Sequence, residues 1–135
     1  MIYLVDANVL SEPTKPAPSG QVIAWLREHE RDLVIDSVVF GELYIGLIAL
    51  PLGRKRAGLE AWFAAVVERI QCLPWDAAVA RRWAELIVGL KKSGQAVPVL
   101  DGMIAATALH HGLTVATRNG RDFEKAGVSI VDPFT

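Results

Sequence analysis

Three carboxylates stand alone in otherwise uncharged stretches of this chain. Asp6 is the only charged side chain among the first 11 residues, and Glu42 and Asp101 are each the only one in a stretch of 17 residues. Charged residues make up 21% of the chain, so three such gaps are unusual for acids that merely face water. This pattern indicates that the three carboxylates belong to a functional site.

A group of carboxylates without neighbouring cations is suited to bind a hard divalent metal ion. Two carboxylates a few ångströms apart repel by about 4 kcal/mol at an effective dielectric constant of 20, so protons or cations must compensate. No Lys or Arg stands beside these three acids in the sequence. Mg²⁺ binds one or two carboxylates together with waters and phosphate oxygens. The sequence therefore predicts metal-assisted hydrolysis of a phosphodiester.

Each acid also has an ordinary structural interpretation. Asp6 can be a turn residue or the N-cap of a short helix that starts near Asn8. Asp101, which follows Pro98, can cap its own helix. Glu42 fits such a role less well, because its helical neighbours at i−4, i+3 and i+7 are all apolar. Taken together, the three acids favour a common site.

The elements expected around these acids alternate between strands and helices. Short apolar runs predict strands at residues 2–5, 33–35, 72–74, 113–117 and 128–131. Helical patterns and caps predict helices from a cap at Ser19 to His29, from a cap at Ser37 to Leu50, over 59–70, from a cap at Asp76 to Gly94, and over 100–111. This order predicts an α/β protein with a parallel sheet and right-handed crossovers, in which ligands bind at the carboxyl ends of the strands.

Length and composition narrow the class further. A chain of 135 residues fits one domain, and its 52% hydrophobic content is enough for a core. The net charge of −1 excludes a global basic field for nucleic acid. The single cysteine, Cys72, excludes a disulfide framework. Without a signal-peptide pattern or an apolar stretch of the ~20 residues that span a bilayer, we expect a cytoplasmic protein with no membrane association.

Four segments, in order, resemble a known family of nucleases. They are Leu-Val-Asp6-Ala-Asn8-Val-Leu-Ser, Val-Val-Phe-Gly-Glu42-Leu-Tyr-Ile-Gly, Asp101-Gly-Met-Ile-Ala-Ala-Thr-Ala and Val-Ala-Thr117-Arg-Asn119-Gly-Arg-Asp122-Phe. The pattern resembles PIN-domain ribonucleases of the VapC type, in the FitB-like branch, which are toxins of type II toxin-antitoxin modules. The resemblance implies a single PIN domain over residues 1–135, a PIN-like α/β/α sandwich around a central, mainly parallel twisted sheet of about four to five strands.

The resemblance also assigns roles to individual residues. It implies that Asp6, Glu42 and Asp101 form the catalytic acidic triad and bind Mg²⁺ or Mn²⁺. Asn8 and Thr117 would be polar neighbours that orient ligands or waters.

The chain departs from the family pattern at two positions. A fourth acid is common where this chain has Asn119, and a hydroxyl residue is common where it has Ala7. Asn119 can still offer a carbonyl oxygen as a supporting polar group. Asp122 either replaces the missing acid or forms a surface ion pair. Arg118 and Arg121 are the expected substrate contacts, because phosphate attraction supplies most nonspecific affinity for nucleic acid.

The function implied by the resemblance is an endoribonuclease toxin that hydrolyses RNA by metal-activated water and leaves a 5′-phosphate. Its expected partners are an RNA substrate, a second copy in a homodimer, and a cognate antitoxin that covers the active site, in a dimer of toxin-antitoxin heterodimers. Residues 43–52 with Trp62 and Phe63 are the predicted groove for a partner helix.

Two other interpretations remain open from the residues. The changes at Ala7 and Asn119 allow a catalytically degenerate PIN domain that binds RNA or protein. An aspartyl-phosphate phosphotransferase-type domain would use Asp6 as its nucleophile, although Asn8 stands where such a site generally has a second acid.

Overall fold

A five-stranded, fully parallel sheet forms the centre of the computed structural model, which describes residues 1–135. The strands lie in the order β3-β2-β1-β4-β5. Their bounds are β1 Tyr3–Val5, β2 Leu33–Asp36, β3 Gln71–Leu73, β4 Thr114–Ala116 and β5 Ile130–Val131. All four strand pairs are parallel, as the alternation of strands and helices predicts.

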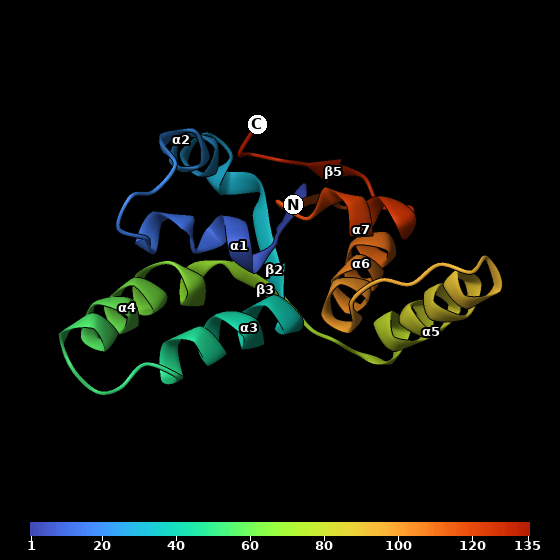
Figure 1. The fold of residues 1–135 in the computed structure, drawn as a ribbon, viewed down its shortest axis with the longest axis horizontal. Coiled ribbons are helices and arrows are strands. Elements are labelled where there is room, and N and C mark those ends of the chain that lie inside the picture. Colours follow the sequence, from blue (N-terminus) through green and yellow to red (C-terminus); the bar gives the residue numbers. More distant parts are fainter.

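Helices cover both faces of this sheet. They are α1 Ala7–Leu10, α2 Gly20–Glu28, α3 Ser37–Ile48, α4 Arg54–Ala65, α5 Ala77–Lys92, α6 Val99–His111 and α7 Gly120–Lys125, with short 3₁₀ turns η1 Glu12–Thr14, η2 Glu30–Asp32 and η3 Val67–Arg69. Figure 1 shows α1, α2 and α4 on one side of the strands and α6 and α7 on the other, with α5 outside α6. The predicted α/β/α sandwich is confirmed. None of these helices combines the length and apolarity needed to cross a membrane.

Capping signals set several helix ends where the sequence predicts them. The Ser19 hydroxyl accepts the N–H of Val22 at 3.3 Å, and the Asp76 carboxylate accepts the N–H of Val79 at 3.0 Å. Both contacts satisfy donors that the first helical turn leaves free. Gly94 has a φ of 71° just after α5, in the left-handed region that glycine adopts without steric cost.

Two predicted helix boundaries were wrong. Asp36, not Ser37, caps α3, because its Oδ1 accepts the N–H of Val39 at 2.9 Å while Ser37 is already helical. The helix predicted over 59–70 instead runs from Arg54 and ends at Ala65, before the β-branched pair Val66 and Val67. Such residues lose side-chain freedom in a helix. The short helix α1 was expected only as the alternative in which Asp6 is an N-cap, and α7 was not predicted, since six residues are too few to show a periodicity.

The core holds the strand ends in register. Leu4 of β1 lies opposite Val34 of β2 and Val115 of β4, and all three are buried. Burying a side chain of this size stabilises the fold by roughly 1.5–3 kcal/mol. On α6, a Cβ at Gly102 would lie 3.3 Å from Cγ2 of Val97, so a larger residue would not fit without a shift. The packing therefore holds the helix turn next to Asp101 tightly.

Candidate active site

Asp6 lies at the carboxyl end of β1, where it is 4% exposed. Its Oδ1 accepts the N–H of Ala7 at 2.8 Å, so it is also the N-cap of α1, as the structural interpretation predicted. Its Oδ2 accepts the hydroxyl of Thr117 at 2.8 Å and Nδ2 of Asn8 at 3.3 Å. Burial raises the pKa of Asp6, and these three hydrogen bonds oppose the shift.

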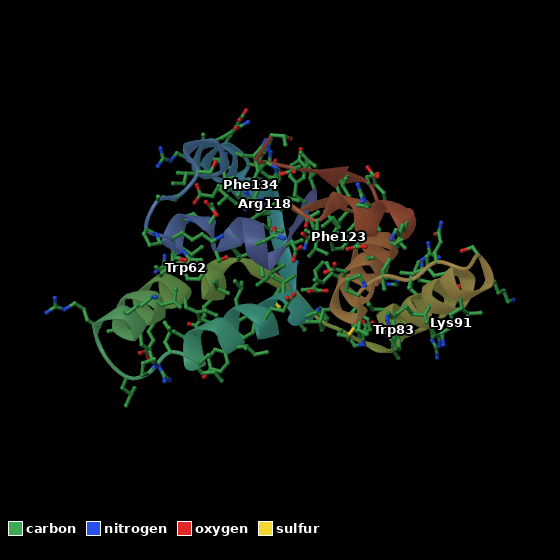
Figure 2. All side chains as sticks on the ribbon, viewed as in Figure 1. Trp62, Trp83, Lys91, Arg118, Phe123 and Phe134 are labelled. Atoms are coloured by element: carbon green, nitrogen blue, oxygen red, sulfur yellow. The ribbon has the colours of Figure 1, made fainter.

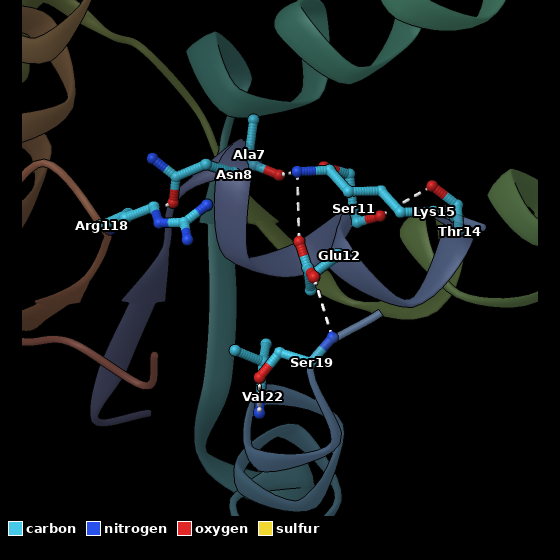
Figure 3. Close-up of polar contacts among 9 residues, drawn as sticks. All are labelled: Ala7, Asn8, Ser11, Glu12, Thr14, Lys15, Ser19, Val22 and Arg118. Atoms are coloured by element: carbon cyan, nitrogen blue, oxygen red, sulfur yellow. Dashed lines mark hydrogen bonds and ion pairs between the residues drawn. The ribbon is translucent and has the colours of Figure 1, made fainter. Parts of the chain in front are cut away.

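The two polar neighbours tie the ends of β1 and β4 together. The Thr117 hydroxyl, which is fully buried, also accepts the N–H of Asn119 at 2.9 Å. Figure 3 shows Asn8 beside Arg118, whose backbone N–H donates to Asn8 Oδ1 at 3.2 Å. The structure thus places Asn8 and Thr117 where they orient the Asp6 carboxylate.

Glu42 projects from α3 without a hydrogen-bonding partner. It is half-buried, and its Oε1 is a buried atom that no donor contacts. Burial raises the pKa of Glu42 to about 7, with the nearby charges of Asp6, Asp101 and Asp36 adding to the shift. A covered carboxylate without a donor is costly unless something outside the chain supplies the missing contact.

Asp101 lies in the first turn of α6, where it is half-buried. The N-cap position belongs to Pro98 and no side chain caps this helix, so the alternative that Asp101 is a helix cap was wrong. Burial raises the pKa of Asp101 to about 6, and the charges of Asp6 and Asp122 add to this shift. The charge of Asp6 raises the pKa of both Glu42 and Asp101, and the charge of Asp101 raises the pKa of Glu42, so the fold places the three predicted acids near one another.

The surroundings of these acids fit a hard divalent cation. The three ion pairs of the molecule involve Glu12, Glu60 and Asp122, so no Lys or Arg neutralises the acids of the triad. Carboxylates and amide oxygens are the donors that Mg²⁺ and Mn²⁺ prefer. No three Asp, Glu, His or Cys side chains lie close enough together to hold a metal ion by themselves, whereas Mg²⁺ usually binds through one or two carboxylates and keeps several of its waters. The uncontacted Oε1 of Glu42 is consistent with such an ion.

A further acid near this group, the buried Asp36, was missed by the sequence analysis. It ends β2, is fully buried, and accepts the Thr107 hydroxyl on its Oδ2 at 2.6 Å. Burial raises the pKa of Asp36, an effect that the hydrogen bond from Thr107 opposes. The signal was present in the sequence, because Asp36 follows an apolar strand just as Asp6 follows β1. It was overlooked because the uncharged stretch around Glu42 begins one residue later.

The residues after β4 divide into two kinds. Asn119 is exposed, precedes α7, and forms no side-chain cap. Asp122 pairs with Lys125 at 3.7 Å, so the surface ion pair predicted for it is present, although its charge still raises the pKa of Asp101. Asp122 therefore lies near Asp101 while its own charge is paired at the surface.

The two candidate substrate residues differ in how they are held. The guanidinium of Arg118 lies 4.0 Å from the centre of the Phe134 ring, a cation–π contact between the end of β4 and the C-terminus. Figure 2 shows these side chains next to each other. Arg121 is exposed and takes part in none of the ion pairs of the molecule.

Two hollows lie away from the acids. A groove of about 710 Å³ runs between α2 and the end of α4, and a second of about 570 Å³ lies between α3, α4 and the chain after α1. Trp62 lines both of them. Of the residues predicted to form a partner groove, Gly46, Leu50 and Trp62 line the second hollow, whereas Leu43, Leu47 and Phe63 are buried in the core and cannot contact a partner helix.

Comparison with known proteins identifies the family. The model of the PIN domain matches residues 3–128. The chain belongs to the PIN-domain family. This PIN domain is 36% identical to VapC ribonuclease Y4jK of Sinorhizobium fredii over 98% of both chains. It is 35% identical to toxin FitB of Neisseria gonorrhoeae, over 98% of this chain and 99% of that protein.

Solved structures agree with this assignment. The PIN domain superposes on a chain of FitAB bound to an IR36 DNA fragment with a TM-score of 0.93 and 33% identity, covering 99% of this chain and 96% of that one. On FitAcB from Neisseria gonorrhoeae it superposes with a TM-score of 0.89 and 35% identity, covering 98% of this chain and 99% of that one. The resemblance to the VapC type and its FitB-like branch is thereby confirmed.

Proposed function

We propose that this PIN domain is a divalent-metal-dependent endoribonuclease and the toxin of a type II toxin-antitoxin module. The observation that carries the proposal is the buried, uncontacted Oε1 of Glu42, in a group of three acids that no cation of the chain neutralises. The curated relatives support it, since they include proteins named VapC ribonuclease, toxin FitB and tRNA(fMet)-specific endonuclease VapC.

The three acids are the proposed catalytic residues, and Asp6, Asp101 and Glu42 would hold Mg²⁺ or Mn²⁺. Such an ion polarises a phosphate oxygen and lowers the pKa of an attacking water. The chain contributes by keeping Asp6 fixed through Asn8 and Thr117. Because the pKa of Glu42 is about 7, its carboxylate is only partly ionised near neutral pH until a cation stabilises its charge.

Basic side chains beside the acids would hold the RNA. Arg118 and Arg121 are exposed on the segment that follows β4, next to Thr117 and Asn119. The cation–π contact with Phe134 limits the freedom of Arg118. A pre-positioned guanidinium loses less entropy when it binds a phosphate than a mobile one does. RNA as the substrate also places the proposed activity in the cytoplasm.

The proposed protein partners are a cognate antitoxin and a second copy of the chain. Several solved relatives are complexes, among them FitAB bound to DNA and FitAcB. The hollow between α3 and α4, which Leu50, Leu59 and Trp62 line, is the proposed seat of a partner helix. On α3 and just after it, large apolar side chains are exposed that a homodimer, or a dimer of toxin-antitoxin heterodimers, would cover: Tyr44, Ile45, Ile48 and Leu52.

Cleavage of a mixed pool of structured and unstructured RNAs tests the activity. We expect cleavage in Mg²⁺ or Mn²⁺, none in EDTA, 5′-phosphate products, and no cleavage by Asp6→Asn or Asp101→Asn. Glu28→Gln, a change at an exposed residue of α2, serves as the control that keeps full activity. Metal-independent cleavage contradicts the proposal. Binding of RNA without cleavage indicates a degenerate binding module, and a phosphorylated Asp6 indicates a phosphotransferase.

A further inference from the structure

Two buried polar side chains join α3 to α6 without belonging to the acidic triad. The hydroxyl of Thr107 donates to Oδ2 of Asp36 at 2.6 Å, and both residues are fully buried. The other oxygen of Asp36 accepts the N–H of Val39 at 2.9 Å. Both carboxylate oxygens of Asp36 therefore accept hydrogen bonds within the fold.

Each residue of this hydrogen bond lies six residues along the chain from one acid of the triad. Asp36 caps α3 and precedes Glu42 by six residues, while Thr107 follows Asp101 by six residues on α6. Six helical residues span about 9 Å along each axis. Figure 1 shows the first turn of α3 beside α6, and the two helices are in contact. The bond thus fixes the two helices that carry Glu42 and Asp101 at one point.

A second, longer contact of Thr107 shows that its hydroxyl bonds mainly to Asp36. Its hydroxyl lies 3.4 Å from the carbonyl oxygen of Met103 in its own helix, against 2.6 Å for Asp36. A buried threonine ordinarily satisfies itself through the carbonyl one turn back. Here the shorter bond runs to another element 71 residues away in sequence. Directional hydrogen bonds of this kind restrict how packed helices slide and rotate, which apolar contacts alone do less strictly.

We propose that Asp36 and Thr107 are positioning residues of the active site. Their hydrogen bond sets the separation of α3 and α6 at which Glu42 and Asp101 contribute to one divalent cation. The inference rests on the proposed function, because the pair itself contacts neither the metal ion nor RNA. Groups that orient metal ligands through hydrogen bonds typically change metal affinity 10- to 100-fold when they are removed.

The first test measures helix position without any metal. Spin labels on cysteines replacing the exposed residues Ile45 of α3 and Val99 of α6, in a Cys72→Ser background, report the distance between the helices by pulsed electron paramagnetic resonance. We expect a narrow distribution for the parent and for Thr107→Ser, which keeps the hydroxyl. We expect a broadened or shifted one for Thr107→Val. Identical distributions in all three proteins overturn the proposal.

The second test measures Mn²⁺ affinity by calorimetry on the unlabelled proteins. Thr107→Val should weaken binding about tenfold and lower kcat while the KM for RNA stays unchanged, and Thr107→Ser should restore both values. Loss of the Thr107 hydroxyl leaves one oxygen of the buried Asp36 without a donor, which can prevent Thr107→Val from folding. In that case the double variant with Asp36→Asn and Thr107→Val, which lacks this buried charge, is measured instead. A folded variant with parental Mn²⁺ affinity shows a merely structural contact and overturns the proposal.

The two tests separate this inference from the proposed function. If the parent protein binds no Mn²⁺ and cleaves no RNA, the proposed function is wrong and the positioning role falls with it. If the parent binds Mn²⁺ and cleaves RNA but the variants do so equally well, the proposed function stands and only the inference is wrong.

Discussion

Glu12, which is buried, and Glu42, which is half-buried, are two glutamates whose surroundings differ. Figure 3 shows Glu12 accepting the N–H of Ser19 at 2.9 Å and pairing with Nζ of Lys15 at 3.1 Å. The hydrogen bond from Ser19, followed by that from Lys15, lowers the pKa of Glu12. Glu42 has neither contact at its Oε1, and burial raises its pKa to about 7.

The difference shows which carboxylate serves the fold and which serves a ligand. At Glu12 the chain itself supplies a donor and a cation, so the charge is satisfied within the protein. At Glu42, Asp6 and Asp101 the chain supplies no cation, and the charge of Asp6 raises the pKa values of the other two. Burial of a carboxylate therefore does not indicate a site by itself. Burial of a carboxylate oxygen with neither a cation nor a hydrogen-bond donor, as at Glu42, does.

Replacing each glutamate by glutamine and measuring RNA cleavage tests this difference between Glu12 and Glu42 most strongly. Glu42→Gln should lower kcat/KM about 10²- to 10³-fold, because metal-assisted charge stabilisation is worth several kcal/mol and each tenfold corresponds to about 1.4 kcal/mol. Glu12→Gln should change it less than about twofold, since Glu12 is satisfied within the fold. Equal losses in the two variants would mean that Glu42 has no special role.

The same two variants should act in the opposite order on stability. In EDTA near neutral pH, Glu12→Gln should lower the urea midpoint, because the ion pair with Lys15 is lost and the hydrogen bond from Ser19 is weakened. Glu42→Gln should leave the midpoint unchanged or raise it, because an unfavourable buried charge is removed. Equilibrium urea unfolding with a constant m-value measures both. A clear loss of stability in Glu42→Gln contradicts the comparison.

The pH dependence of stability should also separate the two regions. The folded pKa values of Glu42 and Asp101, about 7 and about 6, lie above their unfolded values, so the folded chain binds more protons across this interval. Without metal, their contribution to the free energy of unfolding therefore falls as pH rises from about 4 to about 7. Glu12, with its lowered pKa, contributes stability that is lost only on acidification.

Urea midpoints between about pH 5 and about pH 8 measure this slope. Mn²⁺ should flatten it, because the ion binds the deprotonated acids of the folded state. Glu42→Gln should reduce the slope even without metal, whereas Glu12→Gln should leave it in place over this range. A slope that Mn²⁺ does not alter would show that the acids do not bind the ion.

The smallest expected effect concerns the contact between Arg118 and Phe134. A cation–π contact at an exposed site is worth about 0.5–1 kcal/mol. Phe134→Ala should therefore raise the KM for RNA about two- to fivefold and leave kcat unchanged, because Arg118 loses its support while the acids do not move. Phe134→Trp, which keeps an aromatic face, is the control. A fall in kcat at constant KM contradicts a role in substrate binding.

Much of the fold was predictable because it depends on local patterns. Apolar runs located all five strands, and the caps Ser19 and Asp76 located the starts of α2 and α5. The uncharged stretches around the three acids predicted that Asp6, Glu42 and Asp101 come together. The charges of Asp6 and Asp101 raise the pKa of Glu42, as expected for acids that lie near one another, while their catalytic and metal-binding roles stay predictions.

The remaining features depend on contacts between distant segments. The bond between Asp36 and Thr107 joins residues 71 apart, and the contact of Arg118 with Phe134 requires the C-terminus to return to the end of β4. No local pattern encodes such pairs. Likewise, the missing donor at Glu42 Oε1 is visible only once every neighbouring element is in place.

Calorimetric titration with Mn²⁺ is the most direct test of the central claim that a cation from outside completes the acidic group. The account predicts saturable binding to the parent protein near pH 8 that weakens toward pH 5.5, as the pKa values of about 7 and about 6 require. Binding should be lost in Asp6→Asn and kept in Glu12→Gln. Absence of saturable binding by the parent, or undiminished binding by Asp6→Asn, would contradict the account.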